Sequence, residues 1–220
     1  MKPILYTLLI LCFFSRAQAQ VISNSPKKFS YGVYVALEHH SMGASVNTKW
    51  QVNDPTIAFE PKSPGFSIGA FGRWTIYPGL AFQPELGISY TQNHAKLQNQ
   101  QEFVQNLTYR FANLEMPVHF VISNPSTTLP IRGIILFGGR FGMNLMDNTY
   151  PQGVSLLREH WALDLGLGAE LFLKNVKIQP EVVYSHGMNN LHDFEGSVYD
   201  WAISRVVRDR LALRVLVMKK

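Results

Sequence analysis

The chain has 220 residues and a formal net charge of +5, with its Lys and Arg residues spread singly along the sequence. Because nucleic-acid binding needs clustered basic residues, this spacing excludes a nucleic-acid partner. The only cysteine is Cys12, so disulfides, thiol nucleophiles and cysteine metal sites are excluded from the rest of the chain. No later stretch reaches 18 uninterrupted apolar residues, which excludes a transmembrane-helix protein.

The N-terminus has the pattern of a secretory signal peptide. Lys2 is followed by an apolar run from Ile4 to Phe14 and by the small-x-small sequence Ala17-Gln18-Ala19. The alternative, an uncleaved anchor, fails because about 11 apolar residues are too few for a helix that needs roughly 20. We therefore expect a signal peptide over 1–19 and one exported domain over 20–220. An exported chain of this composition is either a soluble periplasmic β protein or an outer-membrane barrel.

Alternation of apolar and polar side chains with period two predicts strands throughout this domain. The clearest case has Trp161, Leu163 and Leu165 on one face, with Asp164 and Gly166 on the other. A helix would mix these two sets. The expected strands are near 29–38, 65–76, 80–90, 107–122, 131–145, 161–173, 176–185 and 211–218.

One of these segments, 107–122, changes parity along its length. Leu114 and the apolar residues after it share one face, whereas Tyr109 and Phe111 fall on the other. The pattern predicts a β-bulge near Ala112-Asn113, because one extra residue would return every apolar side chain to the same face.

The connections alternate between long and short. The long ones are 39–64, 91–106, 146–158 and 187–208, and the short ones are 77–79, 123–130 and 174–175. This sorting predicts an all-β fold, an eight-stranded antiparallel transmembrane up-and-down β-barrel with four long extracellular loops and periplasmic termini. A soluble sandwich has no reason to sort its loops by length.

The two faces of the strands identify which one is inside. One face carries bulky apolar residues, and the other carries glycines and charges, which suit the crowded inside of a narrow barrel. Buried charges must be paired, so we expect a structural charge network in the lumen. An ion or proton path is the alternative, although eight strands leave no room for an aqueous channel. The network is predicted to contain Glu38, Arg73, Glu85, Glu115, Arg132, Arg140, Asp164, Glu170, Lys177, Glu181 and Arg214.

Residues that could do chemistry are few and scattered. A hydrolytic set could be built from Ser185, His186 and Asp193, but the chain has no G-x-S-x-G elbow. The histidines lack the spacing of a metal site, and no phosphate loop or dinucleotide fingerprint is present. We therefore expect no catalytic residue, no metal and no cofactor. The histidines considered as metal ligands are His39, His40, His186 and His192.

An ordered series of short motifs runs along most of the chain. The motifs, in order, are Pro64-Gly65-Phe66-Ser67-Ile68-Gly69, Leu114-Glu115-Met116-Pro117-Val118, Arg132-Gly133, Gly138-Gly139-Arg140-Phe141-Gly142-Met143-Asn144-Leu145, Gly166-Leu167-Gly168, Pro180-Glu181 and Tyr184-Ser185-His186-Gly187-Met188-Asn189-Asn190-Leu191. This series resembles the PorT family of outer-membrane β-barrels from Bacteroidetes-type bacteria. The resemblance extends over roughly 30–218, and its most specific part is Gly187-Met188-Asn189-Asn190-Leu191.

The resemblance implies a non-enzymatic accessory component of type IX protein secretion in the cell outer membrane. It carries over no catalytic residue. Its implied partners are outer-membrane lipids and other membrane proteins of the secretion system. Asn189, Asn190 and Leu191 form the candidate partner loop, and the alternative is that they merely cap the preceding strand.

Two features depart from the family, and two other functions stay open. The chain ends Val217-Met218-Lys219-Lys220 without a terminal aromatic residue, and its first loop carries Trp50 and Pro55. These departures allow a paralogue with another role. The rival functions are a structural or adhesive barrel with no role in secretion and a lipid-modifying barrel enzyme.

Overall fold

The computed structural model describes residues 29–46, 56–59, 63–98, 104–124, 131–146, 154–194 and 203–219. The expected signal peptide, 1–19, and Trp50 and Pro55 lie outside these ranges. Within them, no helix is long and apolar enough to cross a bilayer.

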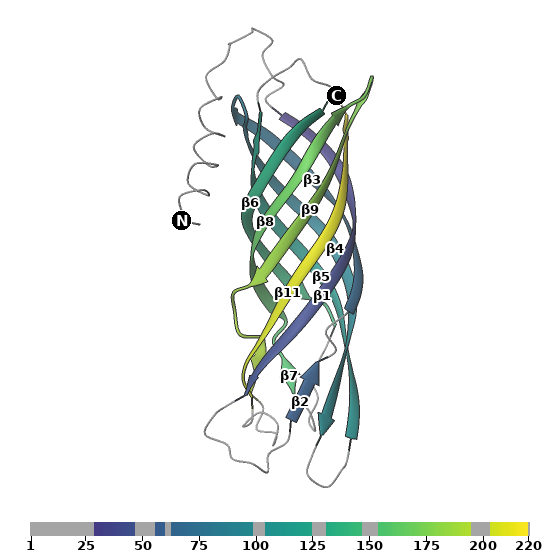
Figure 1. Ribbon diagram of the computed structural model, residues 1–220, viewed down its shortest axis with the longest axis vertical. Coiled ribbons are helices and arrows are strands. Elements are labelled where there is room, and N and C mark those ends of the chain that lie inside the picture. Colours follow the sequence, from purple (N-terminus) through teal and green to yellow (C-terminus); the bar gives the residue numbers. More distant parts are fainter. Residues whose placement is uncertain are drawn as a thin grey trace, which may run out of the picture.

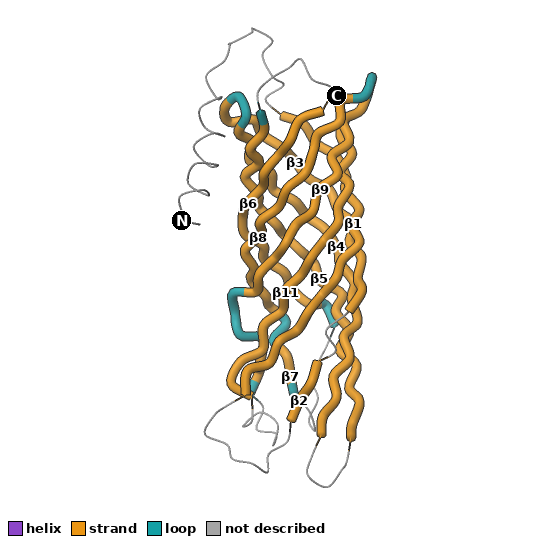
Figure 2. The backbone as a smooth tube through the Cα atoms, viewed as in Figure 1, coloured by secondary structure: helices purple, strands orange, loops and turns teal. Residues whose placement is uncertain are grey.

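Eight long strands form a closed antiparallel barrel (Figures 1 and 2). Each pairs with its neighbours along the chain, and the first pairs with the last to close the ring. This confirms the predicted fold class. The strands are β1 (Phe29–Val46), β3 (Ser63–Tyr77), β4 (Leu80–Gln98), β5 (Val104–Ser123), β6 (Ile131–Asn144), β8 (Glu159–Phe172), β9 (Val176–Gly187) and β11 (Ile203–Lys219).

Three short strands lie near the extracellular end. β2 (Thr56–Phe59) pairs with the end of β4, and β7 (Ser155–Leu156) pairs with β10 (His192–Asp193) in a separate two-stranded sheet. This second sheet joins the loop before β8 to the loop after β9. The opposite, periplasmic end holds the short turns, the start of β1 and the end of β11 (Figure 1, top).

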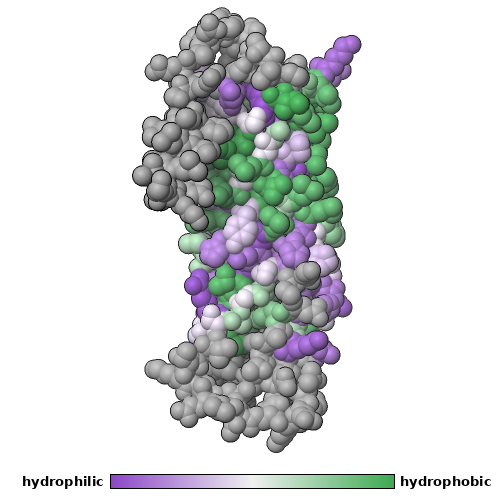
Figure 3. Space-filling model, in the orientation of Figure 1, coloured by the Kyte–Doolittle hydropathy of each residue, from purple (hydrophilic) through white to green (hydrophobic). Residues whose placement is uncertain are grey.

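The exterior of the barrel is apolar over most of its height. Outward side chains such as Val35, Ile68, Leu165 and Leu213 are exposed on the strand surface, as the alternation predicted. Figure 3 shows a hydrophobic exterior toward the periplasmic end and more hydrophilic residues toward the other end. Such an apolar band is the surface that an outer-membrane barrel presents to lipid. Because the sheet is closed, every strand within this band has a neighbour on both sides for its backbone hydrogen bonds.

The predicted bulge near Ala112-Asn113 is wrong. The β4–β5 pairing keeps one register from Leu80↔Ile122 to Gln98↔Val104. Tyr109 and Phe111 therefore share the inner face with Glu115, and both are buried. The backbone of β5 continues in one register with β4, but beyond this point the outer face becomes polar and the inner face becomes apolar.

The exchange of polarity marks the point where the strands leave the lipid. At this end outward side chains such as His94, Lys96 and Arg110 are polar and exposed, whereas the inner side chains form a buried apolar cluster. We call it the extracellular plug; it consists of Met42, Ala95, Leu107, Tyr109, Phe111, Val154, Leu156, Leu191, Ile203 and Val206.

The barrel is consequently taller than the sequence pattern indicated. The segments 39–46, 91–98 and 203–208 were expected in loops, yet they belong to β1, β4 and β11. Their outer faces are polar and their inner faces mix apolar residues with buried polar ones such as His40 and Arg208, so a search for strands facing lipid misses them.

A charge placed on the lipid-facing surface tests the barrel. Leu167 is 64% exposed at mid-strand in β8, so Leu167→Arg should lower the free energy of unfolding by about 2–4 kcal/mol. Leu167→Phe should be close to neutral. Folding titrations in lipid vesicles measure both variants, and equal tolerance of the two would contradict a lipid-facing position.

A pair of phenylalanines on β5 tests the plug. Phe111→Ala should cost about 3–5 kcal/mol, because it leaves a cavity among packed side chains. Phe120→Ala should cost less, because Phe120 faces outward and lipid chains fill the space that it leaves. Denaturant unfolding in vesicles compares the two variants. Equal costs would indicate that both side chains face lipid, as a bulge requires.

Candidate functional site

The lumen is lined by glycines wherever a large side chain crosses it. Tyr34 lies across β3 and β4, and a Cβ on Gly87 would be 2.1 Å from its hydroxyl oxygen. On β6, a Cβ on Gly142 would be 2.0 Å from the ring of His160. Inner-face glycines therefore make room for the polar side chains that fill the barrel.

All eleven residues predicted for the network lie on the inner face, nine of them buried and the two nearest the periplasm, Arg132 and Lys177, half-buried. At this end Glu170 Oε1 accepts hydrogen bonds from Arg73 Nη1 at 2.7 Å and Lys177 Nζ at 2.8 Å. The Arg132 guanidinium instead lies over the ring of Phe172, 4.6 Å from its centroid.

Two glutamines carry the network from Arg73 toward the middle of the barrel. Arg73 donates to the side-chain oxygens of Gln83 and Gln179. Their amide groups in turn donate to Glu85 and Glu181, each at 2.8 Å.

The middle of the lumen is organised around Arg214 and His119. Arg214 lies 2.5 Å from Glu85 Oε2 and 3.0 Å from Glu181 Oε1. His119 lies between two carboxylates, with Nδ1 2.9 Å from Glu85 and Nε2 2.8 Å from Asp164. Only a doubly protonated ring donates to both, so His119 behaves here as a cation.

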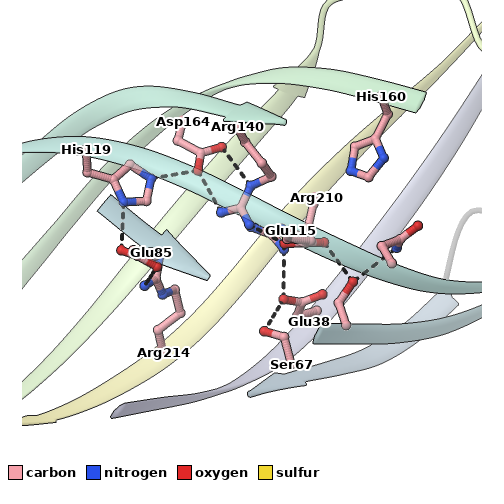
Figure 4. A network of polar contacts seen from close by, with 12 residues as sticks. Glu38, Ser67, Glu85, Glu115, His119, Arg140, His160, Asp164, Arg210 and Arg214 are labelled. Atoms are coloured by element: carbon pink, nitrogen blue, oxygen red, sulfur yellow. Dashed lines mark hydrogen bonds and ion pairs between the residues drawn. The ribbon is translucent and has the colours of Figure 1, made fainter. Parts of the chain in front are cut away.

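Two arginines extend the ion pairs toward the extracellular end (Figure 4). Arg140 Nη2 donates to Asp164 at 2.6 Å, and its Nη1 donates to Glu115. Arg210 bridges Glu115 at 2.9 Å and Glu38 at 2.8 Å. The ion pairs described above are therefore joined in one connected network.

The network leaves little empty space. A cavity beside Arg140, Arg210 and His160 has a volume of about 10 Å³, room for about one water molecule. Dense packing of paired charges stabilises a closed lumen and offers no aqueous path through the described part of the barrel.

Several buried polar residues of the lumen were missed by the sequence reasoning. Arg208 and His40 lie on strand ends that were expected in loops, and Arg210 lies just before the expected last strand. His119 lies within the expected strand 107–122 but was not included in the predicted network. The signal that could have found Arg208 and Arg210 is continued alternation: Val206, Arg208 and Arg210 share a face with Arg214.

The candidate partner loop holds the strand ends together. Asn189 Oδ1 accepts a hydrogen bond from Trp161 N at 2.8 Å, and its Nδ2 donates to Glu159 O at 2.9 Å. Asn190 Oδ1 accepts from Val206 N at 2.8 Å. Leu191 is buried in the extracellular plug. The two amides thus tie this loop to β8 and β11.

The possible hydrolytic residues are not brought together. Ser185 is buried in the lumen, whereas the next residue, His186, points outward and lies 2.9 Å from Asp209. Asp193 belongs to the short strand β10. Among the described residues, no group of three His, Cys, Asp or Glu side chains could hold a metal ion.

This barrel defines an outer-membrane protein, and comparison with known proteins agrees. Residues 18–193 match the family described as outer membrane protein beta-barrel domain, and the chain belongs to that family. No curated protein matches the chain significantly.

Solved structures share the fold at low sequence identity. The chain is similar to the outer membrane protein OprG from Pseudomonas aeruginosa, with a TM-score of 0.54 and 10% identity over 87% of this chain and 94% of OprG. It also matches Neisserial surface protein A, with a TM-score of 0.46 and 12% identity over 85% of this chain and 96% of that protein. The likeness to OprG shows the fold alone.

Removing one carboxylate from the network should destabilise the barrel strongly. Glu115→Ala leaves Arg140 and Arg210 short of a partner, so the expected loss of unfolding free energy is about 3–5 kcal/mol. Glu159→Ala, on the exposed outer face of β8, should cost little. Urea titrations followed by tryptophan fluorescence compare the variants. A small effect of Glu115→Ala would show that its ion pairs are dispensable.

Proposed function

We propose that this chain is a non-enzymatic accessory component of type IX protein secretion, acting through contacts with other outer-membrane proteins. The observation that carries the proposal is the filled lumen. Ion pairs, together with the hydrogen bonds of Gln83 and Gln179, join Glu170 near the periplasmic end to Glu38 near the extracellular end, through residues of six further strands, which leaves no aqueous path through the described barrel. A barrel that transports nothing through its lumen acts through its outer surfaces.

The ordered motifs that resemble the PorT family select the secretion role among such barrels. As part of the same proposal, the chain is exported in a Bacteroidetes-type cell and cleaved after Ala19. Its partners are then membrane proteins of the secretion system, together with the lipids around the barrel.

The extracellular end offers a surface suited to such a partner. Met188 and Phe194 are 51% and 54% exposed on either side of the candidate partner loop. Apolar side chains exposed on loops beyond the lipid-facing band are typical of protein-binding surfaces. The hydrogen bonds of Asn189 and Asn190 fix the loop that carries Met188, which lowers the entropic cost of binding.

The rival functions have less support. An adhesive or purely structural barrel would use the same loops without affecting secretion, and the motif series is what favours the secretion role. A lipid-modifying enzyme would need a nucleophile beside its base, whereas Ser185 and His186 lie on opposite faces of β9.

The double variant Met188→Ser/Phe194→Ser tests the proposal. It should leave a heat-modifiable, membrane-inserted barrel, because neither side chain belongs to the plug or the network. Secretion of type IX cargo should fall several-fold, measured as the ratio of cargo in the medium to cargo in the cells.

The control is Glu159→Ser, at the same end of the barrel and also exposed. It should secrete normally. Normal secretion by the double variant would remove this surface from the mechanism, and normal secretion in a strain lacking the gene would overturn the proposed function itself.

A further inference from the structure

Arg208 is a buried arginine with no carboxylate partner among the described residues. It lies on the inner face of β11, donates from Nη2 to His160 Nε2 at 3.0 Å, and has its guanidinium 4.9 Å from the centroid of the Phe111 ring. Neither contact supplies negative charge.

The six acidic side chains of the network are already engaged by other cations. Glu170 pairs with Arg73 and Lys177, and the other five pair with Arg140, Arg210 or Arg214. These five are Glu38, Glu85, Glu115, Asp164 and Glu181. Arg132 also lacks a carboxylate in the described ion pairs, but it is half-buried near the periplasmic end of β6. Arg208 is therefore the fully buried arginine in the described lumen that no carboxylate contacts; Glu115 and Glu38 attract it only from farther away and do not offset its desolvation in full.

A cavity with unused hydrogen-bond donors adjoins Arg208. Its volume is about 10 Å³. Arg210 Nε and Ser185 Oγ are buried without a hydrogen-bond partner, and both residues line the cavity. Figure 4 shows Arg140, Arg210 and His160 from this part of the lumen. The remaining lining residues are His40, Glu115, Ala162 and Arg208.

We infer that this cavity binds one small monovalent anion of the halide class. Arg208 supplies the compensating charge, and Arg210 Nε–H and Ser185 Oγ–H supply the donors. A polyatomic oxyanion such as sulfate needs more space than a cavity that holds about one water molecule. A metal cation would meet three guanidinium groups, those of Arg140, Arg208 and Arg210.

A buried water molecule is the competing occupant. Water could donate to His40 Nδ1, which also lacks a partner, but it would leave the charge of Arg208 uncompensated. The two occupants therefore differ in whether halide concentration changes the stability of the barrel.

The test uses the purified full barrel in detergent, with chloride replacing gluconate at constant ionic strength. The temperature of heat modification should rise with chloride and then saturate, and bromide should act like chloride whereas sulfate should not. Crystals grown with bromide should show one anomalous peak between Arg208 and Ser185. The absence of both halide dependence and a bromide peak would assign the cavity to water and overturn the inference.

Matched arginine variants locate the effect. Arg208→Met keeps the length of the side chain and removes the charge, so its unfolding temperature should not depend on halide. In gluconate it should exceed that of the wild type, because the uncompensated charge is gone. Arg132→Met should keep the halide dependence, and dependence retained by Arg208→Met would place the anion elsewhere.

A milder variant covers the case in which Arg208→Met fails to fold. Ser185→Ala removes one donor with little change in volume, and it should raise the chloride concentration of half-maximal effect several-fold. An unchanged chloride titration for Ser185→Ala would remove this hydroxyl, and with it the proposed cavity, from the anion site.

Discussion

The surroundings of the barrel change from lipid to water partway along its strands, and the distribution of side chains follows from this change. Where the outside is lipid, apolar residues such as Val118 point outward and charges such as Glu115 point inward. Where the outside is water, polar residues such as Arg110 point outward and Phe111 points inward. One continuous β5, in one register with β4, serves both environments because side-chain direction depends only on the period of two.

The narrowness of the lumen explains why every acidic side chain of the network is paired with a cation. Eight strands leave space for side chains but not for bulk water, so each carboxylate finds its partner among residues of other strands. Arg140 on β6 reaches Glu115 on β5 and Asp164 on β8, and Arg214 on β11 reaches Glu85 on β4. Arg140 thus ties β6 to its two neighbouring strands, whereas the Arg214–Glu85 pair joins non-neighbouring strands across the lumen, which braces the barrel against flattening. The same packing that fixes its shape removes any aqueous path.

The fold could be read from the sequence because the lipid-facing part obeys a simple rule. Alternation located all eight strands, and loop lengths indicated their order and direction. The rule failed where its assumption failed: Tyr109 and Phe111 were read as evidence of a bulge because the outside was taken to be lipid along the whole strand. For the same reason His40 and Arg208 were assigned to loops. Which charge pairs with which could not be predicted, because the partners are set by the register and stagger of the closed ring.

The filled lumen and the extracellular plug give the loop after β9 fixed points of attachment. Asn189 and Asn190 bond to backbone atoms of β8 and β11, and Leu191 packs into the plug, so the loop after β9 is held at three points by the barrel. The pairing of β7 with β10 extends this support to the loop before β8. Residues that hold the loop and residues proposed to bind a partner are then neighbours. Asn189 and Asn190 fix the backbone, while Met188 and Phe194 leave their apolar side chains exposed. Under the proposed function, a partner would contact the surface whose shape the amides determine, so one short motif would be both structural in its contacts and specific in its sequence.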